Sequence, residues 1–242
     1  MDAIFDAMMA ATMMSGSAAG DSYTKAEADA KFVPKDAAEI SLFEDVKVKV
    51  RLIDCVGYMV DGAGGHIENG EERMVKTPWF EYEIPFTKAA GIGTQKVIHD
   101  HATIGVVITT DGSICDLDRE DYLSAEEKTI RELQSIGKPF IVLVNSRKPY
   151  GEEAKRVGEE LKEKYQVTTM TVNCEQLREE DIHRIMENVL FEFPISEVQF
   201  YIPKWVEMLP REHKIKMDLI YHMREMMQHL SEIKDAVGGV CC

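Results

Sequence analysis

The sequence predicts an α/β protein with a parallel sheet flanked by helices, followed by a helical C-terminal segment. Short apolar runs alternate with stretches of helical periodicity between about residues 39 and 193. Several of these runs lack polar alternation, which is typical of parallel strands buried on both faces. With 242 residues, of which 45% are hydrophobic, the chain is long enough for one large domain with an appendage.

The first two predicted strands are residues 40–43 and 46–53. From residue 46, valine at every second position alternates with lysine or arginine, which indicates a strand with one solvated face. A glycine-rich loop follows at residues 58–85, and loops of this length are usually functional. Residues 86–100 have a helical pattern.

Strands and helices then alternate. The predicted order is strand 104–109, a helix from Ser124, strand 140–144, helix 154–161, strand 167–172 and helix 182–190. Ser124 and Glu127 have the spacing of a capping box, so we expect that helix to begin there, with Ile130 and Leu133 facing the core.

The C-terminal segment has a different pattern. A helix starting near Arg211 is predicted to carry one apolar stripe, made of Leu219, Met223, Met226, Leu230 and Ile233. The stripe is consistent with packing on the chain's own domain, on another domain, or in a short coiled coil.

These patterns divide the chain into three parts. Residues 1–30 form a leader and linker rich in methionine and alanine, residues 31–195 form the α/β domain, and residues 196–242 begin a further segment with the amphipathic helix. Asp2 and Asp6 occupy the region where a secretory signal needs basic residues.

Composition excludes several classes of protein. The net charge of -15 argues against general nucleic-acid binding, because an acidic surface repels phosphate backbones. No stretch approaches the ~18 apolar residues of a membrane span. The five cysteines lack zinc-binding spacing, and His99 and His101 have no further ligand nearby in the sequence.

Asp54 and Gly57 form the first candidate site. They follow the predicted strand 46–53 as Asp-Cys-Val-Gly. In phosphate-loop nucleotidases an aspartate at such a strand end holds Mg²⁺, and the glycine amide can meet the γ-phosphate. The alternative is an ordinary turn in which Asp54 caps its own backbone.

Asn145 is the second candidate. It stands at a strand end where guanine-specific enzymes carry Asn-Lys-x-Asp, but here the run is Asn-Ser-Arg-Lys. Lys148 occupies the position that needs a carboxylate, and a lysine cannot accept a hydrogen bond. The pattern argues against guanine specificity.

The phosphate-binding loop itself is missing from the sequence. Such a loop reads G-x-x-x-x-G-K-[ST] between a strand and a helix. Gly137-Lys138 is followed by proline, and the pairs Lys76-Thr77 and Lys128-Thr129 lack the glycine frame. We therefore expect impaired catalysis and a sheet that is incomplete towards the N-terminus.

A set of motifs resembles one family, the stage IV sporulation protein A family. The matching runs are KFVP at residues 31–34, VRLIDCVGY at 50–58, TPW at 77–79, EIPF at 83–86, AGIGT at 90–94, TIGVVITTDG at 103–112, GKPF at 137–140 and FEFP at 191–194. The resemblance covers roughly residues 31 to 236.

The resemblance implies a P-loop NTPase-like fold of the translation-factor GTPase type and an ATPase that uses Mg²⁺ and ATP. It implies polymerisation on the forespore surface in the mother cell, where the polymer seeds coat assembly. The implied partners are the chain itself or a full-length homologue, spore coat proteins and a small forespore-membrane anchor protein.

The chain departs from the family pattern in three places. The phosphate-binding loop is absent, Ala26-Glu-Ala-Asp-Ala30 replaces a threonine-rich switch, and we expect the later domains to be cut off after Ile233. Only Asp54, Gly57 and Asn145 carry family roles over, Asp54 as the metal carboxylate. An active nucleotidase completed by another segment, a non-enzymatic co-assembly module and an inactive gene fragment remain open.

Overall fold

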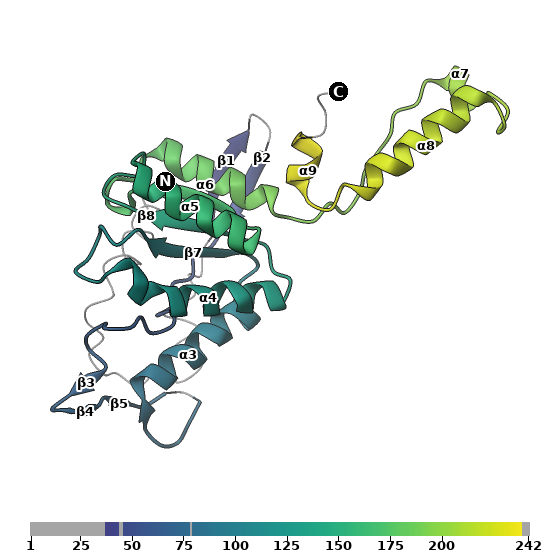
Figure 1. Cartoon of the computed structure of the whole chain (residues 1–242). Helices are drawn as coiled ribbons and strands as arrows, with labels where there is room; N and C mark the ends of the chain where they lie inside the picture. The colour runs from purple at the N-terminus through teal and green to yellow at the C-terminus, as the bar shows by residue number, and fades with distance from the viewer. Residues whose placement is uncertain (1–36, 44–45, 78, 239–242) are drawn as a thin grey trace. The chain divides into compact units, whose positions relative to one another are not determined.

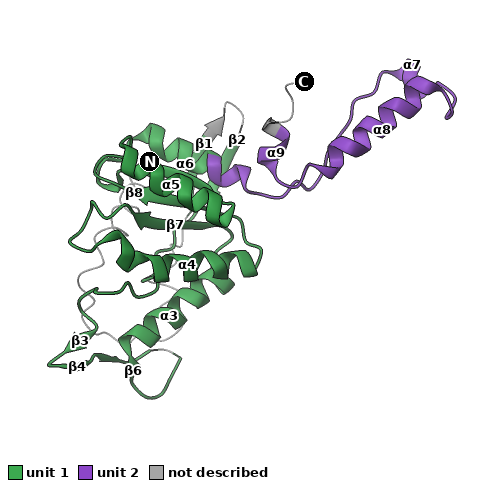
Figure 2. Ribbon diagram, in the orientation of Figure 1, with its two compact units in different colours: residues 1–187 green, residues 188–242 purple. Residues whose placement is uncertain are grey.

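The computed structural model describes residues 37–43, 46–77 and 79–238. The chain divides into two compact units, Met1–Glu187 and Asn188–Cys242 (Figure 2). The predicted leader at residues 1–30 and the motif at residues 31–34 lie outside the described residues.

The larger unit contains a parallel sheet of three strands in the order β7–β8–β9 (Figure 1). The strands are β7 (Gly105–Thr110), β8 (Phe140–Asn145) and β9 (Thr168–Val172). All six residues of β8 are buried, as the unbroken apolar run predicts for a central parallel strand. The α/β class and the parallel sheet are confirmed.

Helices cover this sheet: α4 (Arg119–Ser135), α5 (Glu152–Tyr165) and α6 (Glu179–Phe191). Helices α4 and α5 contribute to one hydrophobic core with one face of β7 and β8. That core comprises Ile98, Val107, Ile130, Leu133, Phe140, Val142, Val144, Val157, Leu161, Tyr165 and Val167. Ile130 and Leu133 are buried in it, as predicted from the helical spacing.

The predicted start of α4 at Ser124 is wrong. The helix begins at Arg119, because Asp118 and Asp121 form the capping box instead of Ser124 and Glu127. The Asp118 amide donates to Asp121 Oδ2 over 3.1 Å. Aspartate is as good an N-cap as serine, so the upstream pair ends the loop first.

The predicted strand 46–53 is also partly wrong. The strand β2 (Val46–Val50) ends earlier, and residues 51–56 have no regular structure. It pairs antiparallel with β1 (Ala38–Phe43), and within the described residues neither strand joins the parallel sheet. The exposed Lys47 and Lys49 show why: a strand with one wet face suits an antiparallel hairpin better than a buried parallel position.

The segment between β2 and β7 holds short hairpins and two helices. Its elements are β3 (Ile67–Glu68), β4 (Glu71–Glu72), β5 (Met74–Val75), β6 (Ile84–Pro85), α3 (Phe86–Lys96) and the π-helical turn η2 (Val97–His101). The predicted loop at 58–85 therefore contains small strands, and the helix predicted at 86–100 is present.

Strand β7 is an edge of the sheet, since β8 is its only partner among the described residues. Val106 and Ile108 of β7 lie opposite Ile141 and Leu143 of β8 and therefore share a face with them. The two β8 residues are 0% exposed, whereas Val106 and Ile108 are 38% and 47% exposed. This face of the sheet is covered at β8 and open at β7.

The smaller unit contains α7 (Lys204–Glu207), α8 (Lys214–Gln228) and α9 (Ile233–Gly238). No residue of α8 is buried. None of the helices in the described residues has both the length and the apolarity of a membrane span.

The predicted continuous C-terminal stripe is wrong, because α8 ends before Leu230 and a second helix begins at Ile233. The break is stabilised by tertiary contacts. The Ile195 amide donates to the Ser231 carbonyl over 3.0 Å, and Asp235 Oδ2 accepts from the Ser231 amide at 3.0 Å. These bonds turn the chain where the apolar spacing alone would continue a helix.

Candidate functional site

The carboxyl ends of parallel strands meet at one edge of a sheet, which is where ligands bind in open α/β folds. After β7, the Ser113 hydroxyl donates to Asp111 Oδ1 over 2.6 Å and accepts from the Arg147 amide at 3.0 Å. Its oxygen also lies 3.5 Å from Ser146 Oγ. Ser113 therefore ties the loops that follow β7 and β8 together.

Asp111 lies at the centre of these contacts. Partial burial raises the pKa of its carboxyl, but hydrogen bonds from the Ser113 and Ser146 hydroxyls and from backbone amides outweigh burial and hold it below 3.8. Asp111 is thus an ionised, oriented carboxylate at the strand ends. Asp111 has no distinguishing signal in the sequence, because an aspartate before a glycine is typical of a turn.

Asn145 ends β8 and is buried. Its Oδ1 accepts from the Cys174 amide over 2.9 Å, which joins β8 to the segment after β9. The Cys174 thiol is buried too, and burial raises its pKa to about 11. The position of Asn145 at the strand end is as predicted, but its amide oxygen bonds the protein backbone. A nucleotide contact by Asn145 stays a prediction.

Asp54 lies exposed in the irregular segment after β2 rather than at the end of a sheet strand. Partial burial of its carboxyl raises the pKa of Asp54, with an opposing hydrogen bond from the Cys55 backbone. Gly57 has a φ of 79°, the left-handed region that favours glycine. A Cβ at Gly57 would meet nothing within 4 Å, so the turn, not a close approach, requires this glycine.

The segment around Asp54 is anchored on helices α3 and α4. The Tyr58 hydroxyl is hydrogen-bonded to Glu132, and Lys128 Nζ lies 3.9 Å from the centre of the Tyr58 ring. Burial and this carboxylate raise the pKa of Tyr58. Tyr58 also hydrogen-bonds to Gln95 of α3. The described contacts of this segment therefore lead to α3 and α4, whereas those of Asn145 lead to the end of β9. The two predicted site residues therefore have separate surroundings.

Gly137-Lys138 is the glycine-lysine pair that most resembles the one in a phosphate-binding loop. In the structure, the ammonium group of Lys138 binds backbone carbonyls. Its Nζ donates to the carbonyls of Ile98, His99 and Ala102 at 2.5, 2.9 and 2.6 Å. Lys138 therefore caps the C-terminal end of η2, where a cation is favoured.

A second lysine pair is likewise engaged within α4. Lys128 stacks on Tyr58, and Thr129 Oγ1 donates to the Ala125 carbonyl one turn earlier over 2.8 Å. Neither side chain takes part in a loop between a strand and a helix.

The described residues contain no group of three or more His, Cys, Asp or Glu side chains placed to hold a metal ion. Mg²⁺ bound with a nucleotide needs only one or two carboxylates together with phosphate oxygens, and Asp54 is the candidate ligand. The amide cradle and lysine that hold those phosphates are not provided by Lys138 or Lys128. The described residues thus do not fit a phosphate-loop nucleotide site.

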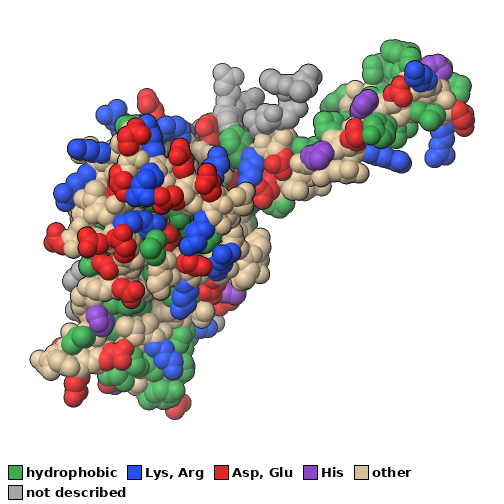
Figure 3. Space-filling model, viewed as in Figure 1, with side chains coloured by type: hydrophobic (Ala, Val, Ile, Leu, Met, Phe, Trp, Pro, Cys, Tyr) green, Lys and Arg blue, Asp and Glu red, His purple; other side chains and the backbone are tan. Residues whose placement is uncertain are grey.

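The structure also reveals a basic pocket of about 620 Å³ between the loop after β8 and the start of α6. Arg147, Lys148, Arg178 and Arg184 line it. No long basic run marks this pocket in the sequence, because Arg147 and Lys148 lie in the loop after β8, whereas Arg178 precedes α6 and Arg184 lies within it. On the face of the larger unit that Figure 3 shows, Lys and Arg are interspersed with Asp and Glu.

Comparison with known proteins agrees with the motifs. The profile of the stage IV sporulation protein A ATPase domain matches residues 2–194, and that of its middle domain matches residues 195–241. The chain belongs to the stage IV sporulation protein A family. The resemblance seen in the sequence is thereby confirmed, and with it a fold consistent with a P-loop NTPase-like ATPase domain.

Stage IV sporulation protein A of Clostridioides difficile (strain 630) is 45% identical over 219 residues, covering 90% of this chain and 45% of the relative. The proteins of the same name from Bacillus subtilis (strain 168) and Bacillus anthracis are each 42% identical over 205 residues, covering 85% of this chain and 42% of the relative. The chain spans less than half the length of these relatives. No solved structure matches it.

Proposed function

We propose that this chain is a spore coat assembly module of the ATPase family whose nucleotide hydrolysis is impaired. The proposal rests on β7, whose outer edge has no partner strand among the described residues and whose face there is partly exposed. In a phosphate-loop fold, the strand that delivers the loop pairs beside this strand and its helix covers the adjacent face. Val106 and Ile108, 38% and 47% exposed, occupy that uncovered surface.

The hydrogen bonds that Lys138 already makes also support impaired nucleotide hydrolysis. Lys138 belongs to the glycine-lysine pair that most resembles the phosphate-binding loop motif. Its ammonium group already donates three hydrogen bonds to backbone carbonyls. Moving it to a phosphate would leave the end of η2 uncapped. A site without the cradle loses several kcal/mol of transition-state stabilisation.

The name of the relatives, stage IV sporulation protein A, supports a role in sporulation. We propose the forespore surface in the mother cell as the location, with coat proteins, a small membrane anchor protein and full-length homologues as partners. Residues 31–195 would form the ATPase-like domain and residues 196–242 the start of the middle domain. Asp54 would supply the carboxylate for any residual Mg²⁺-ATP binding, with Gly57 close to it in the chain and Asn145 as a second nucleotide contact in separate surroundings.

Calorimetry with Mg²⁺-ATP and a phosphate-release assay test this proposal directly. The expected result is no steady phosphate release above a blank from the purified chain. The variant Asp54→Ala should abolish any residual nucleotide binding, whereas Asp61→Ala, an exposed aspartate in the following loop, should not. Steady turnover that is lost in Asp54→Ala and kept in Asp61→Ala would show an active nucleotidase and refute the impairment.

A second candidate function is co-assembly through α8 without any enzymatic step. The observation that favours it is the exposure of Met217, Tyr221 and Met227, which are 55%, 58% and 50% exposed. Apolar side chains gather over α7 and α8 (Figure 3). Methionines suit adaptable contacts, and residues 195–241 match the model of the family's middle domain.

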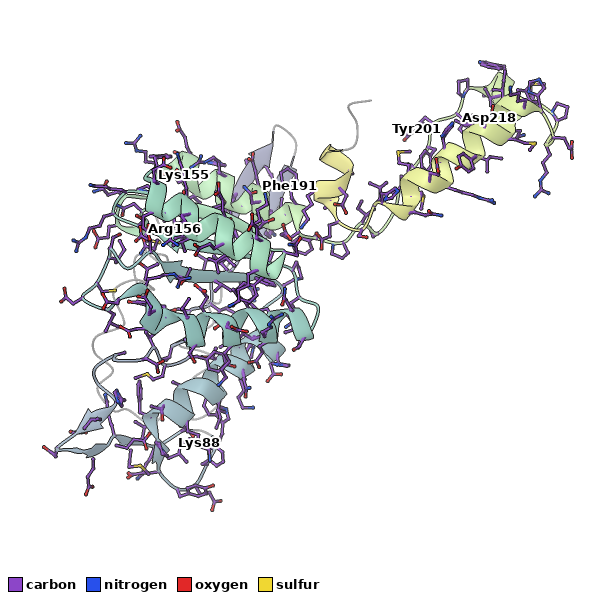
Figure 4. The ribbon with its side chains drawn as sticks, viewed as in Figure 1. Lys88, Lys155, Arg156, Phe191, Tyr201 and Asp218 are labelled. Carbon is purple, nitrogen blue, oxygen red and sulfur yellow. The ribbon has the colours of Figure 1, made fainter. Side chains whose placement is uncertain are left out.

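Co-sedimentation of the chain with a full-length relative tests whether α8 mediates co-assembly. Tyr221→Ser combined with Met227→Ser should reduce co-sedimentation, while Asp218→Asn should not, since Asp218 is an exposed polar residue of the same helix (Figure 4). Equal recovery of both variants in the pellet would remove α8 from the assembly surface.

A further inference from the structure

The basic pocket at the carboxyl edge of β8 and β9 is not explained by the proposed function. One wall is the loop from Arg147 to Gly151, and the opposite wall is the segment from Asn173 into α6. Lys148 stands where a guanine-specific enzyme has a carboxylate, so the change that removes guanine recognition also adds a cation to this pocket.

The carboxylates in the pocket do not cancel its charge. Asp181 is occupied, because its Oδ2 accepts from the Arg178 amide over 3.1 Å and its Oδ1 pairs with Arg184 at 2.8 Å. Because Arg184 is paired with Asp181, three basic residues of the lining, Arg147, Lys148 and Arg178, remain against one acidic residue, Glu180. This excess of positive charge occurs in a chain whose net charge is -15.

We propose that this pocket binds the phosphate group of a small phosphorylated molecule. Guanidinium groups match phosphate oxygens in geometry and charge, and lysine adds a mobile point charge. The volume of about 620 Å³ lies in the range of small-molecule sites rather than of single-ion sites.

Tyr150 supplies the second element of recognition. It lines the pocket, and its side chain is 73% exposed. An exposed aromatic face beside a phosphate site can stack on the ring of a base, which every nucleobase offers. A nucleoside monophosphate therefore fits the pocket better than inorganic phosphate does.

The proposal is independent of Asp54, whose described surroundings lie on α3 and α4. Binding in the pocket needs no Mg²⁺, because the cations of the protein itself neutralise the phosphate. The two sites are separated experimentally by omitting Mg²⁺ and by comparing their variants.

The test is calorimetry on the full chain at low ionic strength with AMP, ribose 5-phosphate, inorganic pyrophosphate and uncharged adenosine, all without Mg²⁺. The three phosphorylated probes should bind, adenosine should not, and affinity should fall as salt rises. The double variant Lys148→Gln/Arg178→Gln should weaken binding at least about tenfold, as expected when hydrogen bonds to a charged group are removed.

The matched control is Lys88→Gln/Lys162→Gln, which removes two exposed cations outside the pocket, on α3 and on the last turn of α5. It should bind like the unaltered chain. Tyr150→Ala should weaken AMP and leave pyrophosphate unchanged if the ligand is a nucleotide, and should change neither if the ligand is a non-aromatic phosphate ester.

A second readout protects the test against a folding defect in the double variant. Titration of the unaltered chain with AMP should shift the amide NMR signals of Gly151 and Asn173, which lie on opposite walls. No binding by any phosphorylated probe at millimolar concentration would overturn the proposal. So would equal loss in the control, or loss in Asp54→Ala with retention in Lys148→Gln/Arg178→Gln, which would place the phosphate in the nucleotide site instead.

Discussion

A buried ion pair within α4, hydrogen-bonded to Thr109 of β7, allows a sharp test of how the larger unit is stabilised. Arg119 Nη2 lies 2.7 Å from Glu126 Oε2, and the Thr109 hydroxyl donates to the same carboxylate over 2.6 Å. The side chains of Arg119 and Glu126 are 15% and 3% exposed. Removing one charge of such a pair leaves the other buried without compensation.

We expect Glu126→Gln to lower the free energy of unfolding by about 3 kcal/mol. The matched control is Glu127→Gln. Its carboxylate is 46% exposed and pairs with Lys164 in solvent, so its replacement should cost much less than that of Glu126. The measurement is urea denaturation followed by circular dichroism at neutral pH. A cost for Glu126→Gln within about 0.5 kcal/mol of the control would refute the reasoning, because the pair would then be effectively solvated.

The double variant Arg119→Met/Glu126→Met checks the cause. Replacing both partners by apolar side chains leaves no unpaired charge, and such replacements are often neutral or stabilising. We therefore expect the double variant to be more stable than Glu126→Gln. A double variant at least as damaging as the single one would show that shape, not the unpaired charge, sets the cost.

Two further predictions concern single side chains. Lys138→Met should destabilise the chain by about 2 kcal/mol, because three carbonyls at the end of η2 lose a charged donor. The control Lys162→Met should change the stability by no more than about 0.5 kcal/mol. Equal thermal midpoints of the two variants would contradict the capping role of Lys138. Ser113→Ala should raise the pKa of Asp111 towards 3.8, because one of the hydrogen bonds that lower it is lost. Since the native pKa of Asp111 lies below its unfolded value, its stabilising contribution is present above that unfolded value and disappears as the pH falls through the native pKa. An NMR titration of the Asp111 carboxyl reads this directly, and an unchanged midpoint in Ser113→Ala would show that Ser113 does not hold the charge.

The buried strands were predictable because their residues have only one possible environment. The apolar run of β8 cannot be exposed on either face without a large hydrophobic cost, so periodicity and length fix it as a central strand. The start of α4 was not predictable to the residue, since Ser124 and Asp118 both begin plausible caps and only the observed bonds of Asp121 decide between them.

The candidate site was less predictable than the sheet. Asp54 was expected at the end of a sheet strand, but β2 ends at Val50 and pairs only with β1 among the described residues. Alternation predicts that a segment is extended, but it does not say which strand it pairs with. The basic pocket was missed for a related reason, because Lys148 and Arg178 meet only through the fold.

The sequence by itself determined the α/β class, the order of the buried strands, the family and the lack of a phosphate-binding loop motif. Each of these depends on local pattern or on residue identity. Tertiary structure decided that Lys138 caps η2, that the C-terminal apolar stripe breaks after α8, and that cations from the loop after β8 and from the start of α6 line one pocket. These features depend on which surfaces meet in space, and the free energy of such contacts is not encoded in the spacing of residues along the chain.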